Sequence, residues 1–212
     1  MFADRREAGR DLAARVSRYS GDPSAIVLAL PRGGVPVGYE VACSLHAPLD
    51  VFVVRKLGVP GHRELAMGAI ASGDVIVLND DVVHGIGIGP AVIDRVVEEE
   101  RAELARRERA YRGDRPPLEV AGRTVILVDD GIATGSSMLA AVEALASRDP
   151  ARTVVAVPVA SHSAVQALQA RVDDVVCVAG LEPFFAIGQL YRNFTQTSDD
   201  EVQRLLAASP PR

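Results

Sequence analysis

The sequence contains little cysteine, few aromatic residues and no long apolar run. Its 212 residues include two cysteines, Cys43 and Cys177, and aromatic side chains make up 4%. Two cysteines so far apart exclude a disulfide framework and a zinc ribbon. Apolar runs such as 25–30 are far shorter than the roughly 18 residues that a membrane helix needs, and the charged first residues are unlike a secretory signal. We therefore expect a reduced, cytoplasmic protein with no membrane partner.

The sequence also lacks an excess of positive charge, with 23 lysine and arginine residues against 28 acidic ones. The formal net charge of −5 and the isoelectric point of about 5.4 argue against a general nucleic-acid binder. Hydrophobic residues make up 48% and charged residues 24%, so a full core is expected and disorder is not. The length suits one domain, and we expect residues 1–212 to form a single unit with a small-molecule partner.

Five short apolar runs alternate with helical segments. Because none of the runs alternates with polar residues, each predicts a strand that is buried on both faces. Alternation of such strands with helices is typical of an α/β fold, here a five-stranded parallel sheet with helices on both faces. The predicted strands are 25–30, 51–54, 124–128, 153–157 and 174–178. The predicted helices are 4–17, 35–45, 91–109, 137–147 and 161–170.

One stretch between the second and third predicted strands departs from this alternation. Two apolar pieces, 66–71 and 75–78, flank the turn residues 72–74 and predict a small hairpin beside the main sheet. The three glycines of 84–90 favour mobility, and the role of the segment 79–90 is left open.

The strongest functional signal follows the third predicted strand. Asp129 and Asp130 come directly after it, and a run of small residues then precedes a predicted helix. Open backbone N–H groups and a helix N-terminus both favour an anion, so this loop is suited to cradle a phosphate. Carboxylates beside such a cradle suit ribose hydroxyls or a hydrated Mg²⁺. The alternative is an acidic turn with a serine cap, which the full run disfavours. The loop consists of Gly131, Ile132, Ala133, Thr134, Gly135, Ser136 and Ser137.

Two other patterns with phosphate chemistry do not fit. A Walker A loop needs Gly-x4-Gly-Lys-Ser/Thr, whereas Gly131 and Gly135 are one residue too close and Ser136 stands in place of the lysine. A phosphorelay receiver domain needs acids from two strands and a later lysine, and the strand ends here supply neither. The loop is therefore expected to hold a sugar phosphate with a metal ion.

The run 125–138 closely resembles the 5-phosphoribosyl 1-pyrophosphate (PRPP) motif of type I phosphoribosyltransferases. That motif is an apolar strand, two acidic residues and a small-residue loop with Thr-Gly. The resemblance covers about 25–178 and implies the fold of that family. It also implies that Asp129 and Asp130 hold the ribose hydroxyls and the metal, and that 132–137 wrap the 5-phosphate.

Two further loops fit the same family. Arg32, Gly33 and Gly34 follow the first predicted strand, where relatives bind pyrophosphate and often have a non-proline cis peptide. A plain glycine turn is the alternative there. Arg55 and Lys56 match a basic pair that approaches the pyrophosphate in relatives, although an isolated pair of this kind is usually solvated.

The resemblance implies an enzyme that binds PRPP with Mg²⁺ and transfers phosphoribose to a nitrogenous base, or the reverse. Arg32, Lys56, Asp129 and Asp130 would carry the catalysis by neutralising the leaving pyrophosphate and fixing the ribose. Glu64 is a candidate general base, for which a surface carboxylate is the alternative. The sequence does not identify the acceptor base, and a homodimer is common in similar proteins.

Two departures separate the sequence from well-known members. Hypoxanthine–guanine enzymes have a base-contacting aspartate where Ala133 stands, which disfavours 6-oxopurine salvage. Orotate enzymes carry a catalytic lysine on a mobile loop, and 79–90 contains no lysine or arginine. The second hypothesis is therefore a PRPP- or nucleotide-sensing module without transfer activity, and a phosphoribosyl-phosphate hydrolase or isomerase is weaker still. The motifs at 63–69 and in the tail are most similar to a little-characterised bacterial branch of the family.

The tail after residue 178 concentrates aromatic side chains. We expect 1–20 and 179–212 to form a hood over the core. Its aromatic rings either pin the tail to the core or leave one ring for a nucleobase, a stacking contact worth roughly 1–3 kcal/mol. Ser198 and Glu201 have the spacing of a capping box for a last helix. The aromatic residues of the tail are Phe184, Phe185, Tyr191 and Phe194.

Overall fold

A five-stranded parallel sheet forms the centre of the protein, in a computed structural model that describes residues 1–181 and 186–211. Its strand order is β2-β1-β6-β7-β8, and every neighbouring pair is parallel. The sheet confirms the predicted fold class. The strands are β1 (Ala25–Ala29), β2 (Leu49–Val51), β6 (Thr124–Val128), β7 (Arg152–Ser161) and β8 (Asp174–Leu181).

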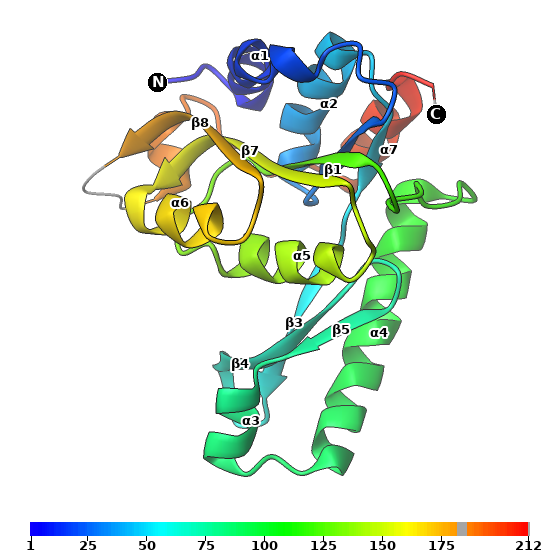
Figure 1. Ribbon diagram of the computed structural model, residues 1–212, viewed down its shortest axis with the longest axis vertical. Helices are drawn as coiled ribbons and strands as arrows, with labels where there is room; N and C mark the ends of the chain where they lie inside the picture. The colour runs from blue at the N-terminus through cyan, green and yellow to red at the C-terminus, as the bar shows by residue number, and fades with distance from the viewer. Residues whose placement is uncertain (182–185, 212) are drawn as a thin grey trace.

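Successive residues of the central strands pack on opposite faces of the sheet, which explains why the strands lack polar alternation. In β1, Val27 and Ala29 belong to one buried cluster, whereas Ile26 and Leu28 belong to another. Helices α1 and α2 cover the first face, and α5 and α6 cover the second (Figure 1). These helices are α1 (Arg5–Arg15), α2 (Gly34–Leu45), α5 (Ser136–Ala146) and α6 (His162–Gln169).

The order of the strands reverses between β1 and β6. After β1 the chain adds β2 on one side, and later adds β6 on the other side. The segments that follow β1 and β6 therefore meet at the carboxyl edge of the sheet, where open α/β sheets bind ligands. The backbone joins them directly, because Leu30 N–H donates to the carbonyl of Val128 at 2.8 Å.

An arm of three antiparallel strands and two helices projects from this core (Figure 1). Strands β4 and β5 pair across the predicted turn and confirm the hairpin, but a further strand, β3, pairs with β4 as well. One prediction needs correction here. The run 51–54 is not one core strand, because β2 ends at Val51 and Val54 already begins β3. The segment 84–90 contains the end of helix α3 and the start of α4, and its mobility stays a prediction. The arm contains β3 (Val54–Val59), β4 (His62–Ala71), β5 (Val75–Leu78), α3 (Asp80–Ile86) and α4 (Pro90–Arg112).

A buried ion pair joins the arm to the core. Arg112, the last residue of α4, donates through Nε to Asp50 Oδ1 at 2.9 Å, and Asp50 is fully buried. The Arg112 guanidinium also donates to the Val51 carbonyl and to Glu108, at 2.7 and 2.8 Å. Burial opposes the charge of Arg112, but Asp50 and Glu108 hold its pKa above the ordinary value. The predicted apolar face of α4 packs on strands β3 and β4 of the arm, and its residues Val96, Val97 and Leu104 are buried.

The first residues of the chain pair with a segment that precedes the last helix, near the carboxyl edge of the sheet. Phe2 and Tyr191 form a parallel bridge, and Asn193 N–H donates to the carbonyl of Ala3 at 2.9 Å. We call residues 2–5 and 187–195 the terminal cap. Ser198 is the N-cap of the last helix, and its side chain accepts from Glu201 N–H, as the predicted capping box requires. The remaining elements are η1 (Ser17–Tyr19), η2 (Ile187–Leu190) and α7 (Asp199–Ala208). In the part of the chain that the structure describes, no helix is long and apolar enough to span a membrane.

Candidate functional site

The loop after β6 is tied to β7 at its start and then turns into α5. Ile132 N–H donates to the Val159 carbonyl at 2.8 Å, and Ser161 N–H donates to the Ile132 carbonyl at 3.0 Å. Ser161 Oγ donates to the Ala133 carbonyl at 2.6 Å. Because its amide is committed to the sheet, Ile132 anchors the loop, and the following residues are left to face a ligand.

This loop encloses a pocket of about 210 Å³ beside Asp129. Gly135 has a φ of 78°, a value that favours glycine, and it turns the chain into the first turn of α5. Helix α5 has no side-chain cap, whereas α1, α3, α6 and α7 each have one. Its first N–H groups are therefore open to an anion. The lining comprises Asp129, Gly131, Ile132, Ala133, Thr134, Gly135, Ser136, Ser137, Met138 and Ile187.

Both acids lie against the loop that follows β1. A Cβ atom added to Gly33 would lie 2.6 Å from Cγ of Asp130, and one added to Gly34 would lie 2.9 Å from Cα of Asp129. Glycine is therefore required at both positions for this close approach. Gly33 is also the N-cap of α2, which again has no side-chain cap. The structure thus brings together the β1 loop, the two acids and the pocket of the β6 loop, and anion binding in this pocket stays a prediction.

The two carboxyl groups differ in their surroundings. Burial raises the pKa of Asp129 well above its usual value, and the charge of Asp130 raises it further. Burial also raises the pKa of Asp130, but the guanidinium of Arg5 opposes this shift. Arg5 Nε lies 2.7 Å from Asp130 Oδ2, and both side chains are 11% exposed. The ion pair of Arg5 with Asp130 could not be predicted from the sequence, because nothing at the start of a surface helix indicates a partner near the site.

Arg32 lies in the loop between β1 and α2. The peptide bond between Pro31 and Arg32 is cis, as the resemblance implied. The guanidinium of Arg32 lies 3.4 Å from the carboxylate of Asp199 at the start of α7, and both side chains are partly exposed. The ion pair of Arg32 with Asp199 therefore joins the β1 loop to the C-terminal helix.

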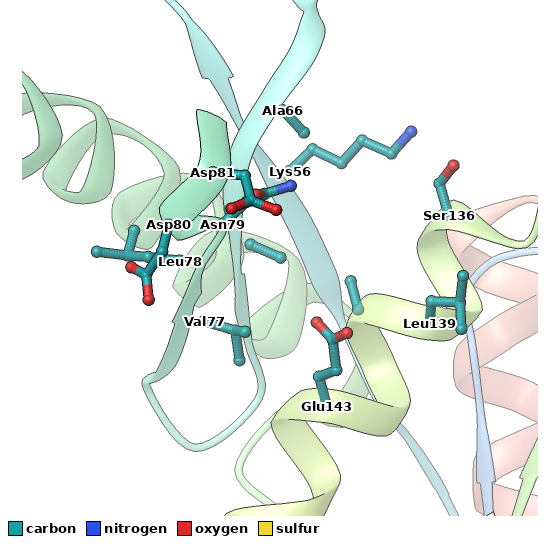
Figure 2. Close-up of a pocket in the computed structure, with 13 residues that line it drawn as sticks. Lys56, Ala66, Val77, Leu78, Asn79, Asp80, Asp81, Ser136, Leu139 and Glu143 are labelled. Carbon is teal, nitrogen blue, oxygen red and sulfur yellow. The ribbon is translucent and has the colours of Figure 1, made fainter. Parts of the chain in front are cut away.

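Arg55 and Lys56 are in strand β3 of the arm rather than in a loop after a core strand. The sequence could not show this, because the apolar run before them has no turn residue. Arg55 is bound to Glu100 of α4 at 2.7 Å. Lys56, the one lysine of the sequence, lines a cavity of about 610 Å³ between the arm and α5. Figure 2 shows Lys56 reaching toward Ser136 across this cavity. Because Ser136 also lines the anion pocket, the two spaces adjoin.

The two described aromatic residues of the tail differ in exposure, since Tyr191 is buried and Phe194 is 36% exposed. The Tyr191 hydroxyl donates to the Asp130 carbonyl at 2.6 Å. The Phe194 ring stacks on Tyr191 at 4.9 Å between centroids, and Arg5 Cζ lies 3.9 Å from the Phe194 centroid. Phe184 and Phe185 lie outside the described residues, as does the side chain of Glu64.

Comparisons with known proteins agree with this arrangement. A family model described as a phosphoribosyl transferase domain matches residues 4–191. Two Mycobacterium tuberculosis proteins, each named "Putative phosphoribosyl transferase", are 50% identical over 206 residues, or 97% of this chain. The match covers 46% of each relative, so the chain spans less than half of their length.

The chain is also similar to solved structures. The crystal structure of TT1426 from Thermus thermophilus has a TM-score of 0.89 and 41% identity, and the match covers both chains completely. A Neisseria gonorrhoeae protein with bound ppGpp has a TM-score of 0.50 and 14% identity, over 96% of this chain and 92% of that one. The second likeness shows the fold alone.

Proposed function

The chain belongs to the phosphoribosyltransferase family, and from that premise we propose that it binds PRPP with Mg²⁺ and transfers phosphoribose to a nitrogenous base. One observation carries the proposal: the pocket of residues 131–138 opens beside Asp129 at the point where the strand order reverses. A phosphate in this pocket would place a sugar next to the acids and a second anion next to the β1 loop. That sequence of groups is phosphate, sugar and pyrophosphate, which is the composition of PRPP.

Each part of PRPP has a partner of suitable chemistry. The 5-phosphate would accept hydrogen bonds from the open N–H groups of 133–137, at the positive end of the α5 dipole. The ribose hydroxyls would donate to Asp129 and Asp130. The pyrophosphate would lie near Gly33, with Arg32 as the closest cation of that loop.

The residues present also fit a magnesium ion. Mg²⁺ is usually held by one or two carboxylates together with substrate phosphates. Asp129 and Asp130 would supply these two carboxylates. The described residues contain no group of three or more His, Cys, Asp or Glu that could hold a metal. When bound, the ion would offset the charge of the leaving group.

The transfer breaks the bond between ribose C1 and the pyrophosphate oxygen and forms a bond from C1 to a nitrogen of the base. The pyrophosphate leaves with the electron pair, and the base loses a proton to water or to the departing pyrophosphate. The protein contributes by holding the reactants in line and by supplying charge where the transition state develops it. Arg32 and Lys56 would stabilise the leaving group, while Asp129 and Asp130 would fix the ribose and offset its developing positive charge.

The test combines calorimetry with a turnover panel. We expect PRPP with Mg²⁺ to give a clear binding heat with the wild type, and no measurable heat with the double variant Asp129→Asn/Asp130→Asn. Equal heats for both proteins would contradict the proposed site. A panel of bases is then assayed for pyrophosphate release, and turnover with one of them is the expected outcome. Binding without turnover for any base would favour the sensing module, for which Ala133 in place of the base-contacting aspartate is a specific reason.

Removing the charge of Lys56 is expected to weaken PRPP binding by about fivefold to tenfold, as for roughly 1 kcal/mol across a solvated gap. Lys56→Gln removes the charge, and Lys56→Arg is the matched control that keeps it. Because Lys56 is the one lysine, acetylation of its amine can be followed by mass spectrometry. We expect PRPP with Mg²⁺ to slow this acetylation. If Lys56→Gln bound PRPP with wild-type affinity and PRPP did not slow the acetylation of Lys56, then Lys56 would not contact the ligand.

A further inference from the structure

The side chain of Arg5 joins the terminal cap to the carboxylate of Asp130. Its guanidinium makes three contacts with different groups. Nε donates to Asp130 Oδ2 at 2.7 Å, an Nη atom donates to the Thr195 carbonyl at 2.7 Å, and Cζ lies over the Phe194 ring. The planar group is therefore fixed in orientation by two acceptors and one aromatic face.

Asp130 is held by this cap on its backbone as well as on its side chain. Tyr191 donates to the Asp130 carbonyl, and the Tyr191 ring packs between those of Phe2 and Phe194. On its other side Asp130 faces Gly33 so closely that no Cβ would fit. The carboxylate thus lies between a cation from the chain terminus and the loop proposed to bind pyrophosphate.

The cap does not depend on Arg5 for its attachment. Backbone hydrogen bonds already join the two segments of the cap. Phe2 N–H donates to the Leu190 carbonyl at 2.7 Å, and Arg192 N–H donates to the Phe2 carbonyl at 2.8 Å. The neighbouring Arg6 shows what an ordinary cation of this helix does. Its side chain is 49% exposed and forms an ion pair with Glu40 at 2.5 Å, a kind of pair that contributes little to stability. The contact of Arg5 with a site carboxylate therefore needs a separate explanation.

We propose that Arg5 is a positioning residue for the sugar: it fixes the carboxylate of Asp130 in the orientation that receives a ribose hydroxyl, and so couples ligand binding to the terminal cap. Arg5 itself does not touch the sugar in this account. The proposal rests on the proposed function, because Asp130 is assigned to the ribose there. It adds that Arg5, the first residue of the N-terminal helix, takes part in ligand binding and that a ligand stabilises the cap by the same coupling.

Calorimetric titration with PRPP and Mg²⁺ tests the proposal on four variants. Arg5→Ala is expected to bind PRPP 10- to 100-fold more weakly than the wild type. Arg5→Lys is expected to fall between them, since an ammonium group cannot serve Asp130, Thr195 and the Phe194 face together. Arg6→Ala, the matched control one residue away, is expected to stay within threefold of the wild type. Phe2→Ala, which loosens the cap but leaves Arg5 and Asp130 in place, is expected to lower the melting temperature and to weaken PRPP binding less than Arg5→Ala does.

Hydrogen exchange supplies a readout that a merely structural role would not change. In the wild type, PRPP with Mg²⁺ should slow amide exchange in 2–8 and 191–196. In Arg5→Ala at saturating PRPP, this added protection should be lost. Wild-type affinity in Arg5→Ala, or an equal loss of affinity in Phe2→Ala, would overturn the proposal. No binding by the wild type itself would instead overturn the proposed function, so the two failures are distinguishable.

Discussion

Replacing Asp50 with alanine is expected to lower the free energy of unfolding by about 3–5 kcal/mol, because it leaves a buried guanidinium without its main partner. Asp50 is fully buried and accepts from Arg112 Nε through both carboxylate oxygens, at 2.9 and 3.1 Å. It also accepts from the N–H groups of Val51 and Leu118. For a chain of this length, the loss corresponds to a fall in melting temperature of roughly 6–20 °C, measurable by calorimetry or circular dichroism.

A variant on α4, the helix that carries Arg112, provides the control. Arg106 forms an ion pair with Glu103 at 2.7 Å, but its side chain is 63% exposed. Arg106→Ala is therefore expected to cost less than about 1 kcal/mol. The double variant Asp50→Leu/Arg112→Leu should recover part of the loss, since replacing both buried charges removes the unpaired ion. If Asp50→Ala were no less stable than Arg106→Ala, the buried pair would not be what anchors the arm.

Replacing Gly33 with alanine is expected to weaken PRPP binding by about 10- to 100-fold, which corresponds to the loss of about one hydrogen bond to a charged group. The new Cβ would collide with the Asp130 carboxylate, which cannot move aside without leaving Arg5. The backbone of Gly33 itself is not the obstacle, because its φ of −59° is open to any residue. The measurement is the same calorimetric titration with PRPP and Mg²⁺.

Gly85→Ala is the matched control for this substitution. Gly85 lies in α3 of the arm, and a Cβ there would meet nothing within 4 Å. We expect this variant to bind PRPP as the wild type does and to be slightly more stable, because alanine is favoured over glycine in helices by up to about 1 kcal/mol. If Gly33→Ala and Gly85→Ala bound PRPP with equal affinity, the position of the Asp130 carboxylate would not affect ligand binding, which would contradict its proposed role.

The sheet and the anion loop could be predicted because their signals are local in the sequence. Strand β6 is a five-residue apolar run buried along its whole length, and the acids and small residues follow it without interruption. The meeting of this loop with Gly33 and Gly34 follows from parallel strands that end at the same edge. The long helix α4 was likewise found from its apolar face.

The arm and the Arg5 contact could not be predicted, because both depend on pairing between distant residues. The run 51–54 carries no turn signal, but the backbone changes partner within it: Phe52 N–H donates to the Ala29 carbonyl, whereas Val53 pairs with Ser72. Arg5 and Asp130 are 125 residues apart, and nothing in a single sequence distinguishes Arg5 from Arg6. The position of Lys56 depends on the arm and was missed for the same reason.

A crystal structure of the chain with PRPP and Mg²⁺ tests the central claim most directly. We predict the 5-phosphate within hydrogen-bond distance of the N–H groups of 133–137, and a ribose hydroxyl within hydrogen-bond distance of Asp129. A sugar phosphate bound elsewhere, for instance in the cavity between the arm and α5, with the pocket beside Asp129 left empty, would contradict the account.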